Sequence, residues 1–431
     1  MKKSFWLIFV LCFVILVGCG KKAKEETKPA AENSAENSAL ATPDPLPQPQ
    51  PEPQPQPQVQ QAEQVPVEQP VDLVSVYRPF AGSLYGRVAA SKEGENFVFS
   101  PLAAFQEMGI LYLGSDGKTK ENIQRLFAAP QLKASEMGNL IGQYTTNQNA
   151  IWQFSALWTQ KEYPVITLFT ERVAKAFGGC NVYSADLLEA KEESLRLINA
   201  WSSDMTGDHL PVVVSDYPEQ TRLMLTNILM HRVNWQKPFH MNKTSDQEFT
   251  PAEGEKVVKS MMHKTDYIPC YQSDKLQMFV LPYLEQQYRI VILMPASEQF
   301  AEFEKFISSG SLDSLFANLS PIGMTLRLPR LEMEDALDLR PFFAKTFENP
   351  NLKGMSQSDL EPLTVGPIIQ KTLFKMNESG PSEIPPPPEP TIDPTLEPGQ
   401  EISTLAVDRP FIFLVWHAPS MTPIIMGRVV K

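Results

Sequence analysis

The sequence predicts an α+β fold for the part of the chain that follows residue 72. Segments with apolar residues at helical spacing are interspersed with short apolar runs of strand length, from about Val74 to Lys431. No second linker interrupts this stretch, so one large domain is expected over residues 73–431. The hydrophobic fraction of 42% is high enough to form a sizeable buried core in that domain.

Three segments show a helical pattern. Pro101–Leu113 carries apolar residues at helical spacing, and the glycines of Gly114–Gly117 end it. A second helix is predicted over Lys118–Phe127, where the apolar residues share one face. Ser194–Asp204 is predicted to be a third amphipathic helix.

Six further runs are predicted to be strands. Arg289–Met294 is apolar at consecutive positions after its arginine, as expected for a strand that is buried on both faces. The six predicted strands are Thr221–Val233, Met278–Pro282, Tyr288–Met294, Met324–Leu331, Ile368–Met376 and Phe411–His417.

The N-terminal residues predict a lipoprotein signal peptide over residues 1–18. Two lysines precede an unbroken apolar run, Phe5–Val17, which is too short to span a bilayer as a mature helix. Small residues then precede Cys19, a pattern typical of a bacterial lipobox. Cys19 is therefore expected to carry lipid and to anchor the mature protein to a membrane. An ordinary secretory peptide with a chance cysteine is the alternative.

Residues 19–72 are predicted to form the lipidated N-terminus and a disordered stalk rich in proline and glutamine. Pro43–Pro57 alternates proline with other residues and favours extended polyproline II, at about 3.1 Å per residue, so it would reach roughly 45 Å. Gly20 follows the lipidated cysteine. By similarity to the sorting rule of two-membrane bacteria, this glycine favours an outer-membrane anchor in the cell envelope; an extracellular location is the alternative.

Charge and the scattered polar residues argue against several classes of function. The net charge of −12 and the pI of about 5.1 leave no basic surface for nucleic acid. The five histidines show no metal-site spacing, and no serine lies in a nucleophile elbow. Gly114–Thr119 lacks the first glycine of a phosphate loop. We expect no metal, no cofactor and no catalytic residue, and hence a monomeric binding protein rather than an enzyme.

Two cysteines, Cys180 and Cys270, remain once the signal peptide has been removed and Cys19 has been lipidated. Two cysteines form no disulfide framework, so buried free thiols are expected. The predicted compartment permits a disulfide between them as the alternative.

Several segments share their order and spacing with one known family. They are Asn96–Pro101, Leu197–Trp201, Leu225–Ile228 with Trp235 and Phe239, Ser260–Met262, Leu328–Leu331, Phe374–Gly380, Asp408–Phe413 and Met426–Val429. Together they resemble the serpin family over residues 75–431. His231 stands where the family usually has an aromatic residue.

The resemblance implies a large central, mostly antiparallel sheet with further sheets, about nine helices and an exposed reactive-type loop. It places the loop at residues 381–404 and its hinge at Glu378, Gly380 and Pro381. The implied activity is inhibition of a serine or cysteine protease. In the family, the protease cuts the loop, and the N-terminal part of the loop then inserts into the central sheet as a new strand.

The hinge departs from the family pattern. Where the family carries small residues, this chain has Pro385–Pro388 and Pro390. Proline has no N–H to donate to a neighbouring strand, and an unsatisfied carbonyl costs roughly 1–3 kcal/mol, so five prolines would cost roughly 5–15 kcal/mol. Full insertion is therefore not expected. The alternative function is a non-inhibitory surface binding or scaffold protein that uses the loop as an interaction arm. Gln370 replaces a histidine that many serpins carry, which predicts a different hydrogen bond there.

The bond that a protease would cut is predicted to lie within residues 393–399. Counting forward from Glu378 places it near Pro394–Thr395, whereas counting back from Pro410 places it near Gly399. The candidate residues are Asp393, Pro394, Thr395, Leu396 and Glu397. No Lys or Arg occurs between Lys375 and Arg409, so a trypsin-like partner is not expected, whereas Leu396 would suit a chymotrypsin- or elastase-like one.

Overall fold

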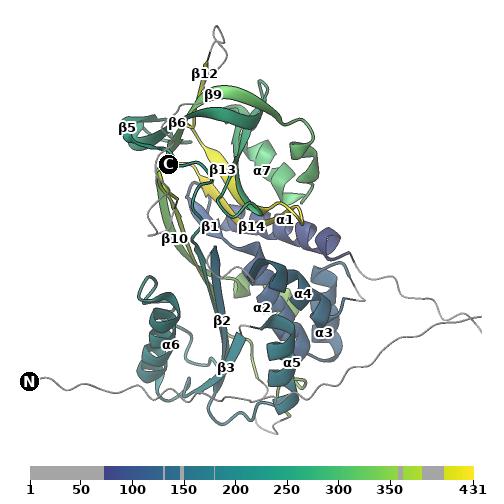
Figure 1. Ribbon diagram of the computed structural model, residues 1–431. Helices are drawn as coiled ribbons and strands as arrows, with labels where there is room; N and C mark the ends of the chain where they lie inside the picture. The colour runs from purple at the N-terminus through teal and green to yellow at the C-terminus, as the bar shows by residue number, and fades with distance from the viewer. Residues whose placement is uncertain (1–71, 130–131, 146–149, 179, 358–362, 381–401) are drawn as a thin grey trace, which may run out of the picture. The chain divides into compact units, whose positions relative to one another are not determined.

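The computed structural model describes residues 72–129, 132–145, 150–178, 180–357, 363–380 and 402–431 (Figure 1). All of them belong to one compact unit, Glu68–Lys431. The predicted signal peptide, Cys19 and the predicted stalk up to residue 71 lie outside the described residues, as does most of the predicted loop. Within the described part of the chain, no helix is both long and apolar enough to cross a bilayer.

A five-stranded sheet has the order β10-β11-β4-β2-β3. Its strands are β10 (Leu331–Asp338), β11 (Ile368–Met376), β4 (Leu223–His231), β2 (Ile151–Gln160) and β3 (Cys180–Ala185). The β10–β11 and β2–β4 pairs are antiparallel, whereas the β4–β11 and β2–β3 pairs are parallel. Every residue of β4 is buried, because this strand lies inside the sheet and is covered on both faces.

A nine-stranded sheet has the order β1-β14-β13-β8-β7-β6-β9-β12, with β5 paired to β6. The bounds of its strands are β1 (Phe97–Phe99), β5 (His240–Phe249), β6 (Val257–Gln272), β7 (Leu276–Pro282), β8 (Tyr288–Pro295), β9 (Ser320–Pro329), β12 (Ser403–Ala406), β13 (Phe411–His417) and β14 (Thr422–Val429). All pairings in this sheet are antiparallel except that between β12 and β9.

The described residues form seven α-helices and three short 3-10 helices. They are α1 (Leu73–Ser91), α2 (Pro101–Gly114), α3 (Gly117–Leu126), α4 (Ala134–Thr145), α5 (Thr167–Phe177), α6 (Lys191–Thr206), α7 (Phe300–Ser308), η1 (Ser297–Gln299), η2 (Asp313–Phe316) and η3 (Arg340–Phe347). The three predicted helices correspond to α2, α3 and α6, and are confirmed within a few residues at each end.

Helix α2 is buried on nearly all sides, as its sequence of almost continuous apolar residues requires. Ser100 caps it, because its Oγ accepts a hydrogen bond from the Ala103 N–H at 3.1 Å, and Pro101 occupies the first helical position. Helices α2 and α6 lie on opposite sides of the five-stranded sheet (Figure 1). The residues of β4 divide accordingly. Leu225 belongs to the larger hydrophobic core on the α2 side. Met224 belongs to a smaller core on the α6 side, which also contains Trp158 of β2 and Trp201 of α6.

One predicted strand is wrong in its extent. Met324–Leu331 is not continuous, because β9 ends at Pro329 and β10 begins at Leu331, and the two strands belong to different sheets. Arg330 lies at the change of sheet. Its backbone N–H donates to the Ser260 carbonyl at 2.9 Å rather than to a partner in the five-stranded sheet. The other five predicted strands are confirmed as β4, β7, β8, β11 and β13.

Cys180 and Cys270 are both buried free thiols. The disulfide alternative is therefore excluded. Burial raises the pKa of the Cys270 thiol, and it raises that of the Cys180 thiol well above its ordinary value.

Candidate functional site

The described structure includes both ends of the predicted loop. The chain before the loop is described to Gly380, just after β11, and the chain after it from Ile402, just before β12. The loop thus connects an interior strand of the five-stranded sheet to the edge strand of the nine-stranded sheet. Residues 403 and 404, predicted to lie in the loop, pair with β9 as part of β12. Pro381 and the candidate residues Asp393, Pro394, Thr395, Leu396 and Glu397 lie outside the described residues.

Glu378 anchors the start of the loop through a buried carboxylate, although its residue type alone would favour an exposed position. Arg330 donates to Glu378 Oε1 from Nε at 2.8 Å and from a terminal nitrogen at 2.5 Å, and the Thr244 hydroxyl donates to the same oxygen at 2.5 Å. Burial alone would raise the pKa of Glu378, but the hydrogen bonds from Arg330 and Thr244 outweigh it and lower the pKa below its ordinary value. The carboxylate is therefore charged, and it joins the loop base to the β9–β10 junction.

Gly380 occupies a position that only glycine fits. Its φ of +108° is strained for residues with a side chain, and a Cβ would lie 2.5 Å from the Asn234 Cα and 2.7 Å from the Val233 carbonyl oxygen. The predicted hinge glycine is thus explained by the close approach of two backbone segments.

The segment after β4 holds the loop base in place through its backbone. The Trp235 N–H donates to the Ser379 carbonyl at 3.0 Å, and the Phe239 N–H donates to the Glu378 carbonyl at 2.8 Å. The indole Nε1–H of Trp235 donates to the Asn377 carbonyl at 2.7 Å. Phe239 therefore bonds the predicted hinge residue Glu378, and Trp235 bonds the residues on either side of it.

β11, the strand that leads into the loop, is paired directly with β4, so no other strand lies between them. These strands pair directly over six register positions, from Ile368 opposite Leu225 to Leu373 opposite Met230. Gln370 lies opposite Asn227 in this register. An inserting loop would have to separate the two strands and replace their backbone hydrogen bonds with its own, which needs N–H donors on both of its edges.

Gln370 ties β11 to the start of α2. Its Oε1 accepts from the Ser100 N–H at 2.7 Å, and its Nε2 donates to the Ser100 carbonyl at 2.8 Å. The Ser100 hydroxyl in turn donates to the Ile424 carbonyl of β14 at 2.8 Å. A glutamine amide supplies a donor and an acceptor at once, so it satisfies both backbone groups of Ser100.

His231 is the last residue of β4, opposite Ile151 of β2 and one residue beyond the stretch that pairs with β11. It is buried between the rings of Tyr283 and Phe374, at centroid distances of 4.8 and 5.0 Å. Neither ring nitrogen makes a well-formed hydrogen bond within the described residues. Burial lowers the pKa of His231 from 6.5 to about 3, and the nearby Lys375 backbone offsets only part of this effect. The imidazole is therefore neutral and acts as an aromatic packing group.

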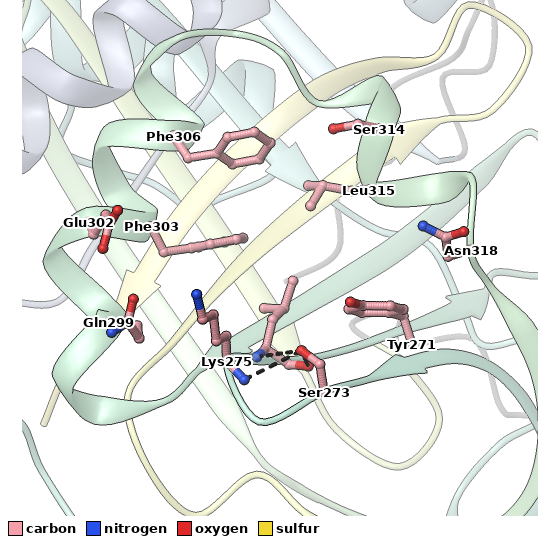
Figure 2. A pocket seen from close by; sticks show the side chains of 11 residues that line it. Tyr271, Ser273, Lys275, Gln299, Glu302, Phe303, Phe306, Ser314, Leu315 and Asn318 are labelled. Carbon is pink, nitrogen blue, oxygen red and sulfur yellow. Dashed lines mark hydrogen bonds between the residues drawn. The ribbon is translucent and has the colours of Figure 1, made fainter.

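A separate cleft of about 390 Å³ lies between α7, η2 and the β6–β7 turn (Figure 2). Leu276, Leu315, Phe303 and Phe306 form its apolar walls, with the two phenylalanine rings 5.5 Å apart, and Lys275 lies at its edge. Clefts of this size and lining are suited to small amphipathic molecules. No sequence motif marks it, because its residues come from three separate segments. In the described part of the chain, no group of three acidic, histidine or cysteine residues is arranged to hold a metal ion.

Comparison with known proteins identifies the family. Residues 75–431 match the family model described as "Serpin (serine protease inhibitor)". The chain belongs to the serpin family. It is 26% identical over 387 residues to an uncharacterized serpin-like protein of Thermococcus kodakarensis, covering 84% of this chain and 86% of the relative. It is 24% identical over 384 residues to the leukocyte elastase inhibitor of Xenopus laevis, covering 83% of this chain and 98% of the relative.

Solved serpin structures share the fold. Native protease nexin-1 with heparin superposes with a TM-score of 0.74 and 21% identity over 83% of this chain and 99% of that one. Human thyroxine-binding globulin complexed with its ligand gives a TM-score of 0.75 and 19% identity over 83% and 98% of the two chains. The predicted α+β serpin fold is therefore confirmed. Serpins are mostly inhibitors rather than enzymes.

Proposed function

We propose that this serpin binds a serine or cysteine protease through residues 381–404 as a reversible ligand, without trapping it by full loop insertion. One combination of observations carries the proposal. Strands β4 and β11 are paired directly, and the segment that would have to separate them contains Pro385–Pro388. An inserted strand must donate N–H groups to both neighbours, and this segment lacks them.

The composition of the loop sets the class of partner. The absence of Lys and Arg between Lys375 and Arg409 disfavours a trypsin-like protease. Leu396 is the large apolar residue near the expected bond and favours a chymotrypsin- or elastase-like one. The leukocyte elastase inhibitor among the relatives is consistent with that class.

The deciding experiment cuts the loop and measures stability. The protein is nicked within 381–401 by chymotrypsin or elastase, and the melting temperature is compared before and after. A change of only a few degrees is expected, together with competitive inhibition that is lost on dilution. A protease adduct that survives boiling in detergent, or a large rise in melting temperature, would contradict the proposal. It would show that the protein traps its protease by inserting the cut loop.

A second function is favoured by the same prolines. The loop would be an interaction arm for a partner that is not a protease, since proline-rich extended segments bind grooves with little loss of chain entropy. The two functions differ in one measurement. A protease partner is competed by a small active-site inhibitor of that protease, whereas a scaffold partner is captured equally well in its presence.

The proposed location is the cell envelope, with Cys19 lipidated and residues 19–72 as the stalk. The lipobox-like Leu16–Cys19 and the proline-rich Pro43–Pro57 support it. Cys19→Ala should move the protein from the membrane fraction to the soluble fraction. Absence of palmitate incorporation into the wild-type chain would exclude the lipid anchor while leaving the loop proposal intact.

A further inference from the structure

Three polar side chains meet in the apolar layer between α2 and the five-stranded sheet. They are Glu107 of α2, Ser155 of β2 and Asn227 of β4, and each is at most 1% exposed. The Ser155 hydroxyl donates to Glu107 Oε1 at 3.1 Å, and the Asn227 amide Nδ2 donates to the Ser155 Oγ at 2.7 Å. The network therefore links one helix to two adjacent strands.

Two acceptor atoms in this network have no donor among the described residues: Glu107 Oε2 and Asn227 Oδ1. The Asn227 side chain lies within interaction range of the Glu107 carboxyl. Two buried acceptors cannot satisfy each other, and each unmet one carries a desolvation penalty. A single proton on Glu107 Oε2 gives both atoms a partner, because the O–H of a protonated carboxyl can donate to Asn227 Oδ1.

We propose that Glu107 is a neutral carboxylic acid in the folded protein, that its O–H donates to Asn227 Oδ1, and that its ionisation detaches β4 from α2. The three hydrogen bonds then form a closed ring in which each side chain donates once and accepts once. Loss of the proton leaves two facing acceptors and a buried negative charge, which opens the ring at the β4 side.

The electrostatic surroundings support a neutral acid. Burial raises the pKa of Glu107 from 4.5 to about 8, and the interactions of its carboxyl with the Ser155 and Asn227 side chains offset only part of the rise. Cys180 of β3 is the titratable group that interacts electrostatically with Glu107, and its own thiol is neutral because burial raises its pKa. Helix α2 also packs against α1, α3, α4, α5, β4, β11 and β14, and no charged group from these elements acts on Glu107 within the described residues.

The hydrogen-bonded ring is connected to the β4–β11 strand pair, and the loop begins just after β11. Asn227 lies opposite Gln370 across the β4–β11 pair, and Gln370 is bound to Ser100 at the start of α2. Helix α2 thus holds β11 through an amide that does not titrate and β4 through a carboxylic acid that does. Alkaline pH therefore weakens the contact between α2 and β4 and leaves the contact between α2 and β11 unchanged. This inference does not depend on which partner binds the loop.

The test compares the full chain with Glu107→Gln, in which an amide N–H replaces the acid O–H and keeps the ring closed at every pH. Because the folded-state pKa is raised, the stabilisation by Glu107 is complete below its ordinary pKa and is lost as pH rises through the folded one. The unfolding constant of the wild type, relative to Glu107→Gln, should rise about tenfold per pH unit between about pH 5 and 8 and level off above. A ratio that does not vary with pH would overturn the proposal.

A second measurement reports the proton directly. The infrared difference spectrum between wild type and Glu107→Gln at pH 6.5 should contain a protonated carboxyl C=O band, which disappears as pH is raised past about 8. A carboxylate band at pH 6.5 overturns the proposal even if the variant is poorly stable. Glu302→Gln on α7, which removes an exposed carboxylate, is the matched control and should leave both the pH profile and this band unchanged.

Discussion

Arg330 and Glu378 form an ion pair with a nitrogen–oxygen distance of 2.5 Å, and it joins the β9–β10 junction to the base of the loop. The carboxylate is buried, whereas the arginine side chain is 46% exposed. The pair therefore orders the last residues before the loop rather than contributing a large net stability, since exposed partners are screened by solvent.

Removal of the arginine leaves a buried charge without its main partner. We expect Arg330→Ala to lower the free energy of unfolding by about 1–3 kcal/mol at pH 7, measured by denaturant titration. The pKa of Glu378 is lowered in the folded state, so its stabilisation is present above the ordinary pKa and is lost as pH falls. The difference between variant and wild type should consequently narrow below about pH 4. Lys256→Ala, which breaks an exposed pair with Glu248, should cost under about 1 kcal/mol.

His231→Phe should stabilise the protein. The substitution keeps an aromatic ring between Tyr283 and Phe374 and removes two buried nitrogens without good partners, which favours the variant by about 1–2 kcal/mol at pH 7. Because the pKa of His231 is lowered to about 3, its neutral form contributes full stability above pH 6.5, and this is lost as pH falls. The advantage of the variant should grow by about 2 kcal/mol between pH 7 and 5. If acidification lowered the free energy of unfolding equally in the wild type and in His231→Phe, the low pKa of His231 would be contradicted.

Gly380→Ala should destabilise the loop base. The added Cβ meets the Asn234 backbone at 2.5 Å in addition to an unfavourable φ, so we expect a loss of about 2–4 kcal/mol in denaturant unfolding. Gly254→Ala is the control, because Gly254 also has a positive φ of +90° but a Cβ added there would have no atom within 4 Å. That variant should lose about 1 kcal/mol, the cost of the backbone conformation alone. Equal losses at both positions would argue against the close approach.

Replacement of residues 381–390 by small residues that carry N–H groups should restore the ability to insert. Removing a penalty of roughly 5–15 kcal/mol should let a nick raise the melting temperature by roughly 10 °C or more, since each kcal/mol corresponds to a few degrees. The same replacement at 391–400 is the control and should leave the response to nicking at the wild-type level. If neither replacement changes that response, the prolines are not what prevents insertion.

A chain that begins at Val71 should fold cooperatively with the melting temperature of the longer mature form. It retains Asp72, whose carboxylate accepts from the Val74 N–H at 3.1 Å and caps α1. The residues removed have no apolar pattern able to pack. If the short chain aggregated under conditions where the mature form stays soluble, the folded domain would have to begin before residue 71.

The sequence was sufficient for the parts of the fold that repeat a local pattern. Consecutive apolar residues located β4, β8 and β13. The parallel pairing of β4 with β11 could not be derived locally, because the two strands are far apart in the chain. The break at Arg330 was missed because apolar residues continue on both sides of it. Glu107 gave no signal, since a lone acid in an apolar helix has no motif.

The C-terminal strands determine what a single cut in the loop would produce. The piece after the cut contains β12, β13 and β14; β13 lies between β8 and β14, and all residues of β13 and β14 are buried. A protease that cleaves residues 381–401 therefore cannot shed this fragment without dismantling the nine-stranded sheet. The product is a two-chain particle that elutes as one species in native buffer and separates into two polypeptides only in denaturant.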